Sequence, residues 1–284
     1  MSGATMMRSR GIHYLQQMKA AKVPIDLIEK GQERIIDASL TLIRETAKLR
    51  GEFLRALGGV VASTSLLGVP LGHNSSFLQG PAFAPPLIRE AMWCGKDIKD
   101  PRVLTDVGDL PVQEIRDAGI DDDRLMNVDP LRPLVLGGDH SISYPVVRAI
   151  SEKLGGPVDI LHLDAHPDIY DAFEGNKYSH ASSFARIMEG NYARRLLQKL
   201  GEGVKGVYIS VDVDCLDPGF APGVSHFEPG GLSFRDAMNI LHNLQGNIVG
   251  ADVVEFNPQR DIYGGMTAMV AAKFVREIAA RMSK

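Results

Sequence analysis

Apolar residues follow two alternating patterns along most of the chain. Some short runs are almost continuously apolar, for example residues 158–163 and 248–254, whereas longer segments repeat apolar residues at helical spacing. A strand that is apolar on both faces is typical of a parallel sheet with helices on both sides. The pattern therefore predicts an α/β fold of three layers, αβα, around a central and mostly parallel sheet.

The predicted elements are bounded by proline, glycine and capping residues, such as Pro70, Gly155 and Ser233. We expect strands at residues 62–69, 103–107, 134–136, 158–163, 207–213 and 248–254. We expect helices at residues 27–57, 85–93, 143–154, 182–200 and 266–282, and one more between Ser233 and Gly246.

Composition narrows the classes of protein that remain. The chain has 284 residues, 44% of them hydrophobic, and no linker-like stretch divides it, so we expect one domain over residues 26–284. A net charge of -4 offers no basic excess for nucleic acid or anionic lipid. The two cysteines, Cys94 and Cys215, are too few for a disulfide framework and fit a reducing compartment. No apolar run approaches the roughly 18 residues that span a membrane, and no nucleotide-binding motif occurs.

Residues 1–25 differ from the rest of the chain because they contain basic residues and no acidic one. Three apolar residues could form one face of a helix there: Ile12, Leu15 and Met18. An acid-free amphipathic start that contains arginine resembles an organellar transit peptide. We therefore predict a mitochondrial transit segment at residues 1–25, and the alternative is a basic tail on a cytoplasmic protein.

Polar residues follow three of the predicted strands, where the active site of a parallel α/β sheet usually lies. The three segments are Gly-Gly-Asp-His-Ser at 137–141, Asp-Ala-His-Pro-Asp at 164–168 and Asp-Val-Asp at 212–214. In an extended chain every second side chain points the same way. Asp164, His166 and Asp168 therefore project together, as do Asp212 and Asp214.

Carboxylates gathered at the ends of buried strands repel one another and lose hydration. No lysine or arginine lies within the three segments, so divalent metal ions are the economical source of positive charge. Ligands that are mostly oxygen, with some imidazole, favour Mn²⁺ over a thiolate-type zinc site. Six candidates suit two ions that share bridging carboxylates: His140, Asp164, His166, Asp168, Asp212 and Asp214. A single such residue is usually structural, and we assign supporting or structural roles to His162, Asp139 and Asp217.

These segments resemble the metal motifs of the arginase/agmatinase (ureohydrolase) family. The resemblance includes the longer run Ser-Val-Asp-Val-Asp-Cys-Leu-Asp-Pro at 210–218, Gly-Gly-Leu at 230–232 and Glu-Phe-Asn-Pro at 255–258. It extends from about residue 32 to the end of the chain. The sequence Leu-Gly-His-Asn-Ser-Ser-Phe at 71–77 is most similar to that of the plant arginases of the family.

The resemblance implies an arginase-like fold and a hydrolase with two Mn²⁺ per subunit. One ion would be held by His140, Asp164, Asp168 and Asp212, and the other by Asp164, His166, Asp212 and Asp214. A hydroxide that bridges the ions would attack the guanidinium carbon and release urea and an amine, which is ornithine if L-arginine is the substrate. The family's homotrimers or homohexamers make a homo-oligomer the expected assembly.

The resemblance also implies catalytic or substrate-binding roles for Asp214, His180 and Glu255. Asp214 would relay a proton to the leaving amine. His180 matches a proton shuttle, for which the ordinary pKa of histidine is suited. Glu255 matches the residue that orients the guanidinium group, and a planar cation invites a bidentate carboxylate.

The residues that bind the amino-acid end of the substrate are less well defined, because the loop at 169–179 departs from the animal members of the family. The candidates are Tyr170, Asn176, Ser179, Asn74 and Ser75. Arginase activity is the predicted function, and agmatinase activity, which yields putrescine and urea from agmatine, is the nearest alternative. Two more distant hypotheses are a deacetylase-type enzyme with a single zinc and a non-catalytic isoform that keeps the metal site.

The chain looks shorter than the family pattern at three places, after Gly95, at Val128-Asp129 and near Gln198-Lys199. At the last of these the family has another βα unit, which this chain is predicted to lack. Loss of a strand leaves backbone groups without partners and uncovers apolar surface. All six predicted metal ligands lie outside the three places.

Overall fold

The computed structural model describes residues 64–92, 104–110, 112, 132–196, 205–262 and 264–283. The predicted transit segment at 1–25, the predicted helix at 27–57 and the short places after Gly95, at Val128-Asp129 and at Gln198-Lys199 lie outside these ranges. Within them, none of the helices is long and apolar enough to cross a membrane.

A seven-stranded parallel sheet forms the centre of the described structure, with the strand order β2-β1-β3-β7-β6-β4-β5. The strands are β1 (Thr64–Val69), β2 (Leu104–Asp109), β3 (Pro133–Gly137), β4 (Val158–Leu163), β5 (Ala193–Leu196), β6 (Val207–Asp212) and β7 (Ile248–Val254). Every residue of β3, β6 and β7 is buried, as expected for strands covered on both faces.

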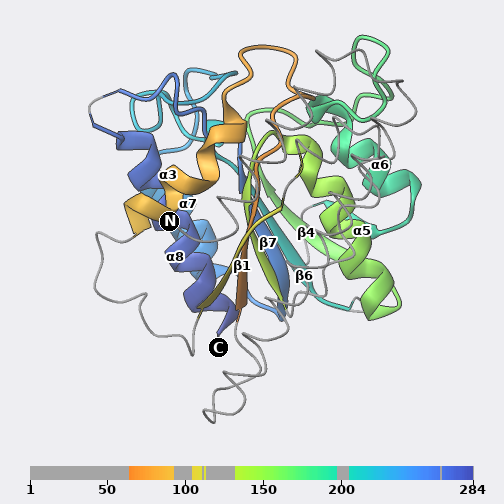
Figure 1. Cartoon of the computed structure of the whole chain (residues 1–284). Helices are drawn as coiled ribbons and strands as arrows, with labels where there is room; N and C mark the ends of the chain where they lie inside the picture. The colour runs from red at the N-terminus through yellow and green to blue at the C-terminus, as the bar shows by residue number, and fades with distance from the viewer. Residues whose placement is uncertain are drawn as a thin grey trace, which may run out of the picture.

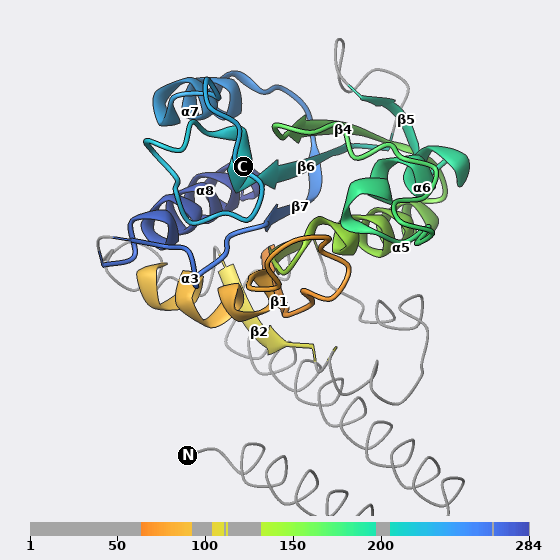
Figure 2. The ribbon, with the colours of Figure 1, turned by 90° about the horizontal axis from the view of Figure 1, so that it is seen from above.

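Helices cover both faces of this sheet (Figures 1 and 2). One face carries α3 (Ala84–Met92), α7 (Phe234–Asn243) and α8 (Met266–Met282), and the other carries α5 (Ser143–Leu154) and α6 (Ser183–Glu189). Single-turn helices η1 (Pro81–Phe83), η4 (His140–Ile142), η5 (His180–Ser182) and η6 (Val213–Cys215) lie in the connections. The α/β class with a parallel sheet is therefore confirmed.

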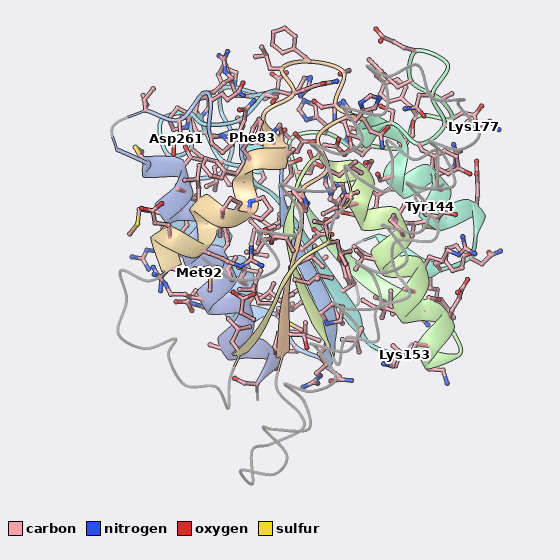
Figure 3. All side chains as sticks on the ribbon, viewed as in Figure 1. Phe83, Met92, Tyr144, Lys153, Lys177 and Asp261 are labelled. Carbon is pink, nitrogen blue, oxygen red and sulfur yellow. The ribbon has the colours of Figure 1, made fainter. Side chains whose placement is uncertain are left out.

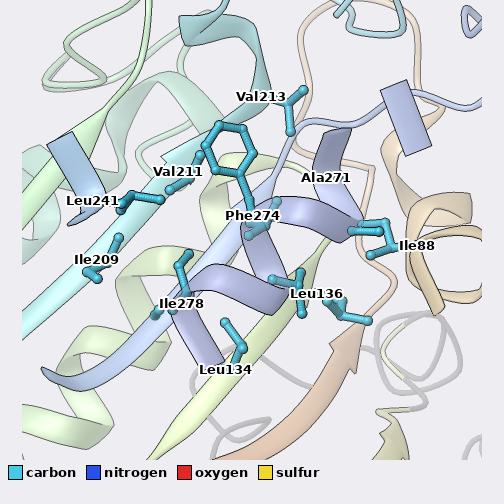
Figure 4. Close-up of a cluster of buried hydrophobic side chains, with 14 of the residues drawn as sticks. Ile88, Leu134, Leu136, Ile209, Val211, Val213, Leu241, Ala271, Phe274 and Ile278 are labelled. Carbon is cyan, nitrogen blue, oxygen red and sulfur yellow. The ribbon is translucent and has the colours of Figure 1, made fainter. Parts of the chain in front are cut away.

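Two apolar layers hold the helices to the sheet. On the face of α8, Phe274 and Ile278 pack over Leu136 of β3 and Ile209 of β6, all of them buried (Figure 4). On the opposite face, Val146 of α5 belongs to a second buried cluster that also contains residues of β3, β4 and β6. Burial of this area fixes the sheet between its helices and so fixes the directions in which the strand ends project.

Local signals in the sequence account for several element ends. Gly155 ends α5 in the left-handed conformation (φ 67°). Ser233 and Asp236 form a reciprocal capping box at the start of α7. The predicted strands at 158–163 and 248–254 and the predicted helices at 143–154 and 266–282 match the structure at both ends.

The predicted helix at 182–200 is wrong. The structure has α6 at Ser183–Glu189, and the chain then turns at Gly190 and Asn191, where Asn191 adopts φ 55°. The edge strand β5 follows at Ala193–Leu196 and pairs with β4. The apolar spacing in this segment is compatible with either element, and strand pairing with β4 decides between them.

Candidate active site

The polar segments predicted from the sequence follow adjacent strands at the middle of the sheet. The order β3-β7-β6-β4 places the carboxyl ends of these four strands side by side. His140 follows β3, Glu255 follows β7, Asp212 ends β6, and Asp164 follows β4. The loops beyond these ends form the upper part of the molecule in Figure 1, and labelled Phe83, Lys177 and Asp261 lie at that end in Figure 3.

The imidazole of His140 is the centre of the candidate site. Its Nδ1 lies 3.0 Å from Asp164 Oδ2 and 3.1 Å from one carboxylate oxygen of each of Asp168 and Asp212. His140 is fully buried, and its Nδ1 makes no hydrogen bond within the described part of the chain. Three carboxylate oxygens from the ends of β4 and β6 therefore surround His140 Nδ1 at 3.0–3.1 Å, in positions that do not meet hydrogen-bond geometry.

A second group lies beside the first and shares Asp164. His166 Nδ1 is 3.0 Å from Asp214 Oδ2 and 3.5 Å from Asp164 Oδ1. Asp164, His166 and Asp214 offer ligand atoms within 4.8 Å of one another. The structure thus brings together all six predicted ligands, which we call the Asp/His cluster: His140, Asp164, His166, Asp168, Asp212 and Asp214.

His162 also lies at the Asp/His cluster, although a structural role is expected for it; it precedes Asp164 by two residues and therefore projects from the same face of the chain. Its Nε2 is hydrogen-bonded to Asp164 Oδ2 at 2.8 Å, and its ring stacks on Phe184 with centroids 3.9 Å apart. His140, His162 and Asp164 also place ligand atoms within 4.8 Å of one another. His162 is therefore in a position to orient Asp164.

The charges of the Asp/His cluster are poorly compensated. Burial, and then the charges of Asp214 and Asp164, raise the pKa of Asp212. Burial likewise raises the pKa of Asp214 to about 6. Hydrogen bonds to Asp164 and Asp214 raise the pKa of His166 to about 10. Like charges held in a dry environment favour either protonation or a bound cation.

The donor set fits two divalent cations. It supplies carboxylate oxygens and imidazole nitrogens, with Asp164 common to both groups, and it contains no lysine, arginine or thiolate. The buried Nδ1 of His140 faces three carboxylate oxygens and has no hydrogen bond, which is the geometry of ligand atoms directed at a common point. Hard or borderline ions such as Mn²⁺ prefer these ligands.

The loop after β3 is held by close backbone contacts. A Cβ atom at Gly138 would lie 1.9 Å from the carbonyl oxygen of Leu71, so only glycine fits there. Asp139 caps η4: its carboxylate accepts hydrogen bonds from the backbone N–H of Ser141 at 3.0 Å and of Asn74 at 2.9 Å. Asp139 therefore ties the loop after β3 to the loop that contains Asn74, which fits the supporting role predicted from the sequence.

Glu255 adopts a left-handed backbone conformation (φ 61°), which is uncommon for a residue other than glycine. This turn directs the side chain towards the end of β3, where Oε1 accepts a hydrogen bond from the backbone N–H of His140 at 2.8 Å. Its Oε2 is buried and has no hydrogen-bond partner among the residues that the structure describes. A buried carboxylate oxygen without a partner is a ready acceptor for a cationic ligand.

His180 and His226 form a stacked pair next to Glu255. His180 Nδ1 lies 3.5 Å from Glu255 Oε1, and its Nε2 is hydrogen-bonded to Ser76 Oγ at 2.9 Å. The ring of His226 stacks on His180 with centroids 5.0 Å apart, and Ser76 Oγ also lies 3.3 Å from His226 Nε2. The sequence patterns do not single out Ser76 and His226, because isolated polar residues in loops carry no spacing signal.

The predicted substrate-binding residues separate into exposed and engaged side chains. Tyr170 is exposed. The Asn74 side chain donates to Ser141 Oγ and accepts from Asn176 Nδ2 at 3.3 Å, so it ties the loops together. Ser179 caps η5, and the buried hydroxyl of Ser75 donates to the carbonyl of Phe77. Of the five, Asn74, Ser75, Asn176 and Ser179 therefore use their polar groups to shape the loops.

Comparison with known proteins identifies the family. The arginase family matches residues 62–198 and 190–280. The chain belongs to the arginase family. It is 67% identical to "Arginase 1, mitochondrial" of Oryza sativa subsp. indica, over 99% of this chain and 100% of the rice protein. It is 68% identical to "Arginase 1, mitochondrial" of Arabidopsis thaliana, over 97% of this chain and 98% of that protein.

A solved structure of the same family has a very similar backbone. The arginase from Medicago truncatula superposes with a TM-score of 0.85 at 61% sequence identity, covering 92% of this chain and 99% of that one. The expected resemblance to the arginase/agmatinase family, and to its plant members in particular, is therefore confirmed.

Proposed function

We propose that this protein is an arginase, which hydrolyses L-arginine to L-ornithine and urea. The observation that carries the proposal is the convergence of the Asp/His cluster, next to Glu255, in a chain 67% identical to a rice arginase over almost its whole length. Consumption of one water molecule balances the reaction, since its oxygen remains in urea.

Two Mn²⁺ ions are the proposed cofactors. His140, Asp164, Asp168 and Asp212 would hold one ion, and Asp164, His166, Asp212 and Asp214 would hold the other. Bound there, the pair would lower the pKa of a shared water so that hydroxide is available near neutral pH. The donor chemistry supports Mn²⁺, and counting ions per subunit would separate this proposal from a deacetylase-type enzyme with a single zinc.

Glu255 is proposed to orient the guanidinium group of the substrate. Its Oε2 is buried without a partner, whereas Oε1 is held by the backbone N–H of His140. A guanidinium group presents parallel N–H donors that match a carboxylate in a bidentate manner. The fixed position of Glu255 would therefore place the guanidinium carbon beside the Asp/His cluster.

Asp214 and His180 are proposed to move protons. The leaving amine needs a proton, and Asp214, whose Oδ2 lies 3.0 Å from His166 Nδ1, is proposed to relay it. His180 is buried between Glu255 and Ser76; burial lowers its pKa, but the contacts with Glu255 outweigh this, so the pKa lies above its usual value. His180 would then carry protons between the Asp/His cluster and solvent.

The choice of L-arginine over agmatine rests on similarity to proteins named arginases. Tyr170, Asn176, Ser179, Asn74 and Ser75 remain the proposed contacts for the amino-acid end. Tyr170 is exposed and is therefore the better placed candidate, whereas the Asn176 amide is engaged by Asn74 and by the backbone of Tyr178. Agmatinase activity is the alternative that the assay below distinguishes.

The proposed absence of one βα unit draws support from two observations. The alignment with the rice arginase runs over 339 positions and this chain has 284 residues, so at least 55 positions of the alignment have no residue here. Only ten residues separate β5 from β6, whereas parallel strands usually need a crossover of about a dozen residues or more. A shortened isoform that binds metal without turnover is the alternative function.

A mitochondrial location is proposed from the same relatives, and a homo-oligomer from the family resemblance. The rice and Arabidopsis proteins are named mitochondrial arginases, which supports a mitochondrial location and a transit segment at residues 1–25. Residues 26–284 would then form the single ureohydrolase domain. A homotrimer or homohexamer is proposed, and light scattering of the purified protein would measure it.

The decisive experiment is a urea-production assay on the purified, Mn²⁺-loaded protein with L-arginine and with agmatine. Urea and ornithine from L-arginine, at a rate well above that from agmatine, is the expected result. Urea from agmatine alone would replace the proposal with agmatinase. Two bound Mn²⁺ without turnover on either substrate would favour the non-catalytic isoform.

A further inference from the structure

A buried carboxylate that no proposed step uses lies directly behind the Asp/His cluster. Asp252 of β7 is fully buried and is paired in register with Ser210 of β6. Its Oδ1 accepts a hydrogen bond from Ser210 Oγ at 2.7 Å, and its Oδ2 accepts from Ser143 Oγ at 2.6 Å and from Tyr208 Oη at 2.7 Å. Within the described ranges Asp252 makes no ion pair with lysine, arginine or histidine.

An isolated buried charge is costly, so a compensating feature is expected nearby. Three hydroxyl groups donate to the two carboxylate oxygens of Asp252 at 2.6–2.7 Å, so Asp252 serves as the acceptor in each of these hydrogen bonds. Hydroxyl groups bring no positive charge. The nearest place where positive charge is proposed is the Asp/His cluster, and Ser210 connects the two.

The hydrogen bonds that connect His140, Ser210 and Asp252 all donate in the same direction, towards Asp252. The single hydroxyl proton of Ser210 is donated to Asp252, so Ser210 Oγ can only accept from His140 Nε2, which lies 2.9 Å away. His140 therefore carries its proton on Nε2. Its Nδ1 is left with a lone pair, and that atom has no hydrogen bond and faces three carboxylate oxygens at 3.0–3.1 Å.

We propose that Asp252, acting through Ser210, is a positioning residue that holds His140 in the tautomer able to bind a metal ion through Nδ1. Tyr208 and Ser143 hold the Asp252 carboxylate in place, and its charge makes the imidazole a stronger ligand. The inference rests on the proposed metal-dependent function. It adds a line of four residues, Asp252, Tyr208, Ser143 and Ser210, to the machinery of the site.

Asp252→Asn provides a sharp test because it preserves shape and reverses polarity. The amide oxygen can still accept from Ser143 and Tyr208, so the amide nitrogen then faces Ser210 and donates to it. Ser210 would donate to His140 Nε2, and the proton of His140 would move to Nδ1, where it blocks metal binding. Ser210→Ala breaks the same connection by a different route.

The experiment measures Mn²⁺ content and dissociation constants on the full chain, with the electron paramagnetic resonance spectrum as a second readout. We expect Asp252→Asn and Ser210→Ala to bind one of the two ions about 10- to 100-fold more weakly and the other within a few-fold of the unmodified protein. The spectrum of coupled Mn²⁺ pairs should be replaced by that of single ions. Ser182→Ala removes a buried hydroxyl that has no hydrogen bond and should leave both constants unchanged.

The outcomes separate the inference from the function on which it rests. If a folded Asp252→Asn protein, or the Ser210→Ala protein where Asp252→Asn does not fold, binds two Mn²⁺ with unaltered constants, the positioning role is wrong. Equal weakening of both ions would also overturn it, since that indicates general loosening of the fold. If the unmodified protein binds no Mn²⁺, the proposed function itself fails.

Discussion

The Asp/His cluster and the loop histidines lie side by side but are held in different ways. The cluster residues sit at the ends of buried strands, where sheet pairing and helix packing leave them little freedom. His180 and His226 belong to loops that are joined by Ser76 and by hydrogen bonds of Asn74. The sheet therefore fixes the positions of the residues proposed to carry out the reaction. The proposed substrate site is lined by loops, whose sequences generally vary more among related proteins than those of strands and helices.

The largest expected effect comes from the cluster itself. Asp212→Asn removes a charge from the position proposed to bridge both metal ions, so urea production should fall by on the order of 10³-fold. Bound Mn²⁺, measured on the same samples, should fall with it. Asp217→Asn is the matched control, because the Asp217 carboxylate lies outside the cluster and accepts hydrogen bonds from the backbone N–H groups of Gly219 and Gly230. Retention of activity within tenfold in Asp212→Asn would remove the cluster from the mechanism.

The next prediction concerns Glu255, which contacts both His140 of the Asp/His cluster and His180 of the loops. Glu255→Gln leaves the volume unchanged but removes the charge proposed to face the guanidinium group. Loss of one partner of a buried, hydrogen-bonded charge pair costs about 3 kcal/mol, which corresponds to a fall of about 10²-fold in kcat/KM. Steady-state kinetics with L-arginine measure it, and exposed Glu228 supplies the control Glu228→Gln. An unchanged KM and kcat would show that the guanidinium group binds elsewhere.

His180 tests whether the loops contribute chemistry as well as shape. His180→Asn should lower kcat by about 10²-fold, the usual contribution of a positioned acid or base. Added imidazole should restore part of the rate, because it can carry the same proton. His242→Asn is the control, since His242 lies on α7 and pairs with Glu277. A rate that falls without any response to imidazole would point to a structural role for His180.

His226 should matter less, because it acts through the stack with His180 and through Ser76. His226→Asn removes one hydrogen bond, worth about 1 kcal/mol, so kcat/KM should fall by about fivefold; Ser76→Ala removes the contacts with both His180 and His226 and should lower kcat/KM further. Measurements on both variants and on the double variant would show whether the two act together. A loss as large as that of His180→Asn would place His226 among the reacting groups.

The smallest effect on activity is expected far from both regions. Ser233→Ala removes the cap of α7 and should destabilise the protein by about 1 kcal/mol, which lowers Tm by about 2–4 °C. Thermal unfolding followed by circular dichroism measures the shift. The rate at 25 °C should stay unchanged, and Ser283→Ala, close to the end of α8, should alter neither quantity.

Much of the fold and nearly all of the cluster could be predicted from local patterns. Asp164, His166 and Asp168 alternate after an apolar run, so their common direction follows from strand geometry alone. The predicted helix at 182–200 is wrong because β5 forms only through pairing with β4, a contact that no local pattern contains. The same alternation rule puts His162, two residues before Asp164, on the face of the cluster, so the purely structural role expected for it is too narrow; the structure shows it hydrogen-bonded to Asp164.

By itself, the sequence determined which strands are buried on both faces, which acidic and imidazole side chains follow them, and hence the metal chemistry that such ligands favour. The tertiary structure alone decided that β3, β7, β6 and β4 are neighbours, that Glu255 turns back onto His140, and that Asp252 reaches His140 through Ser210. The physical reason is the separation along the sequence over which each kind of contact acts. Side-chain periodicity arises within a few residues, whereas these contacts join residues 42 to 115 positions apart, and only packing of the whole sheet brings them together.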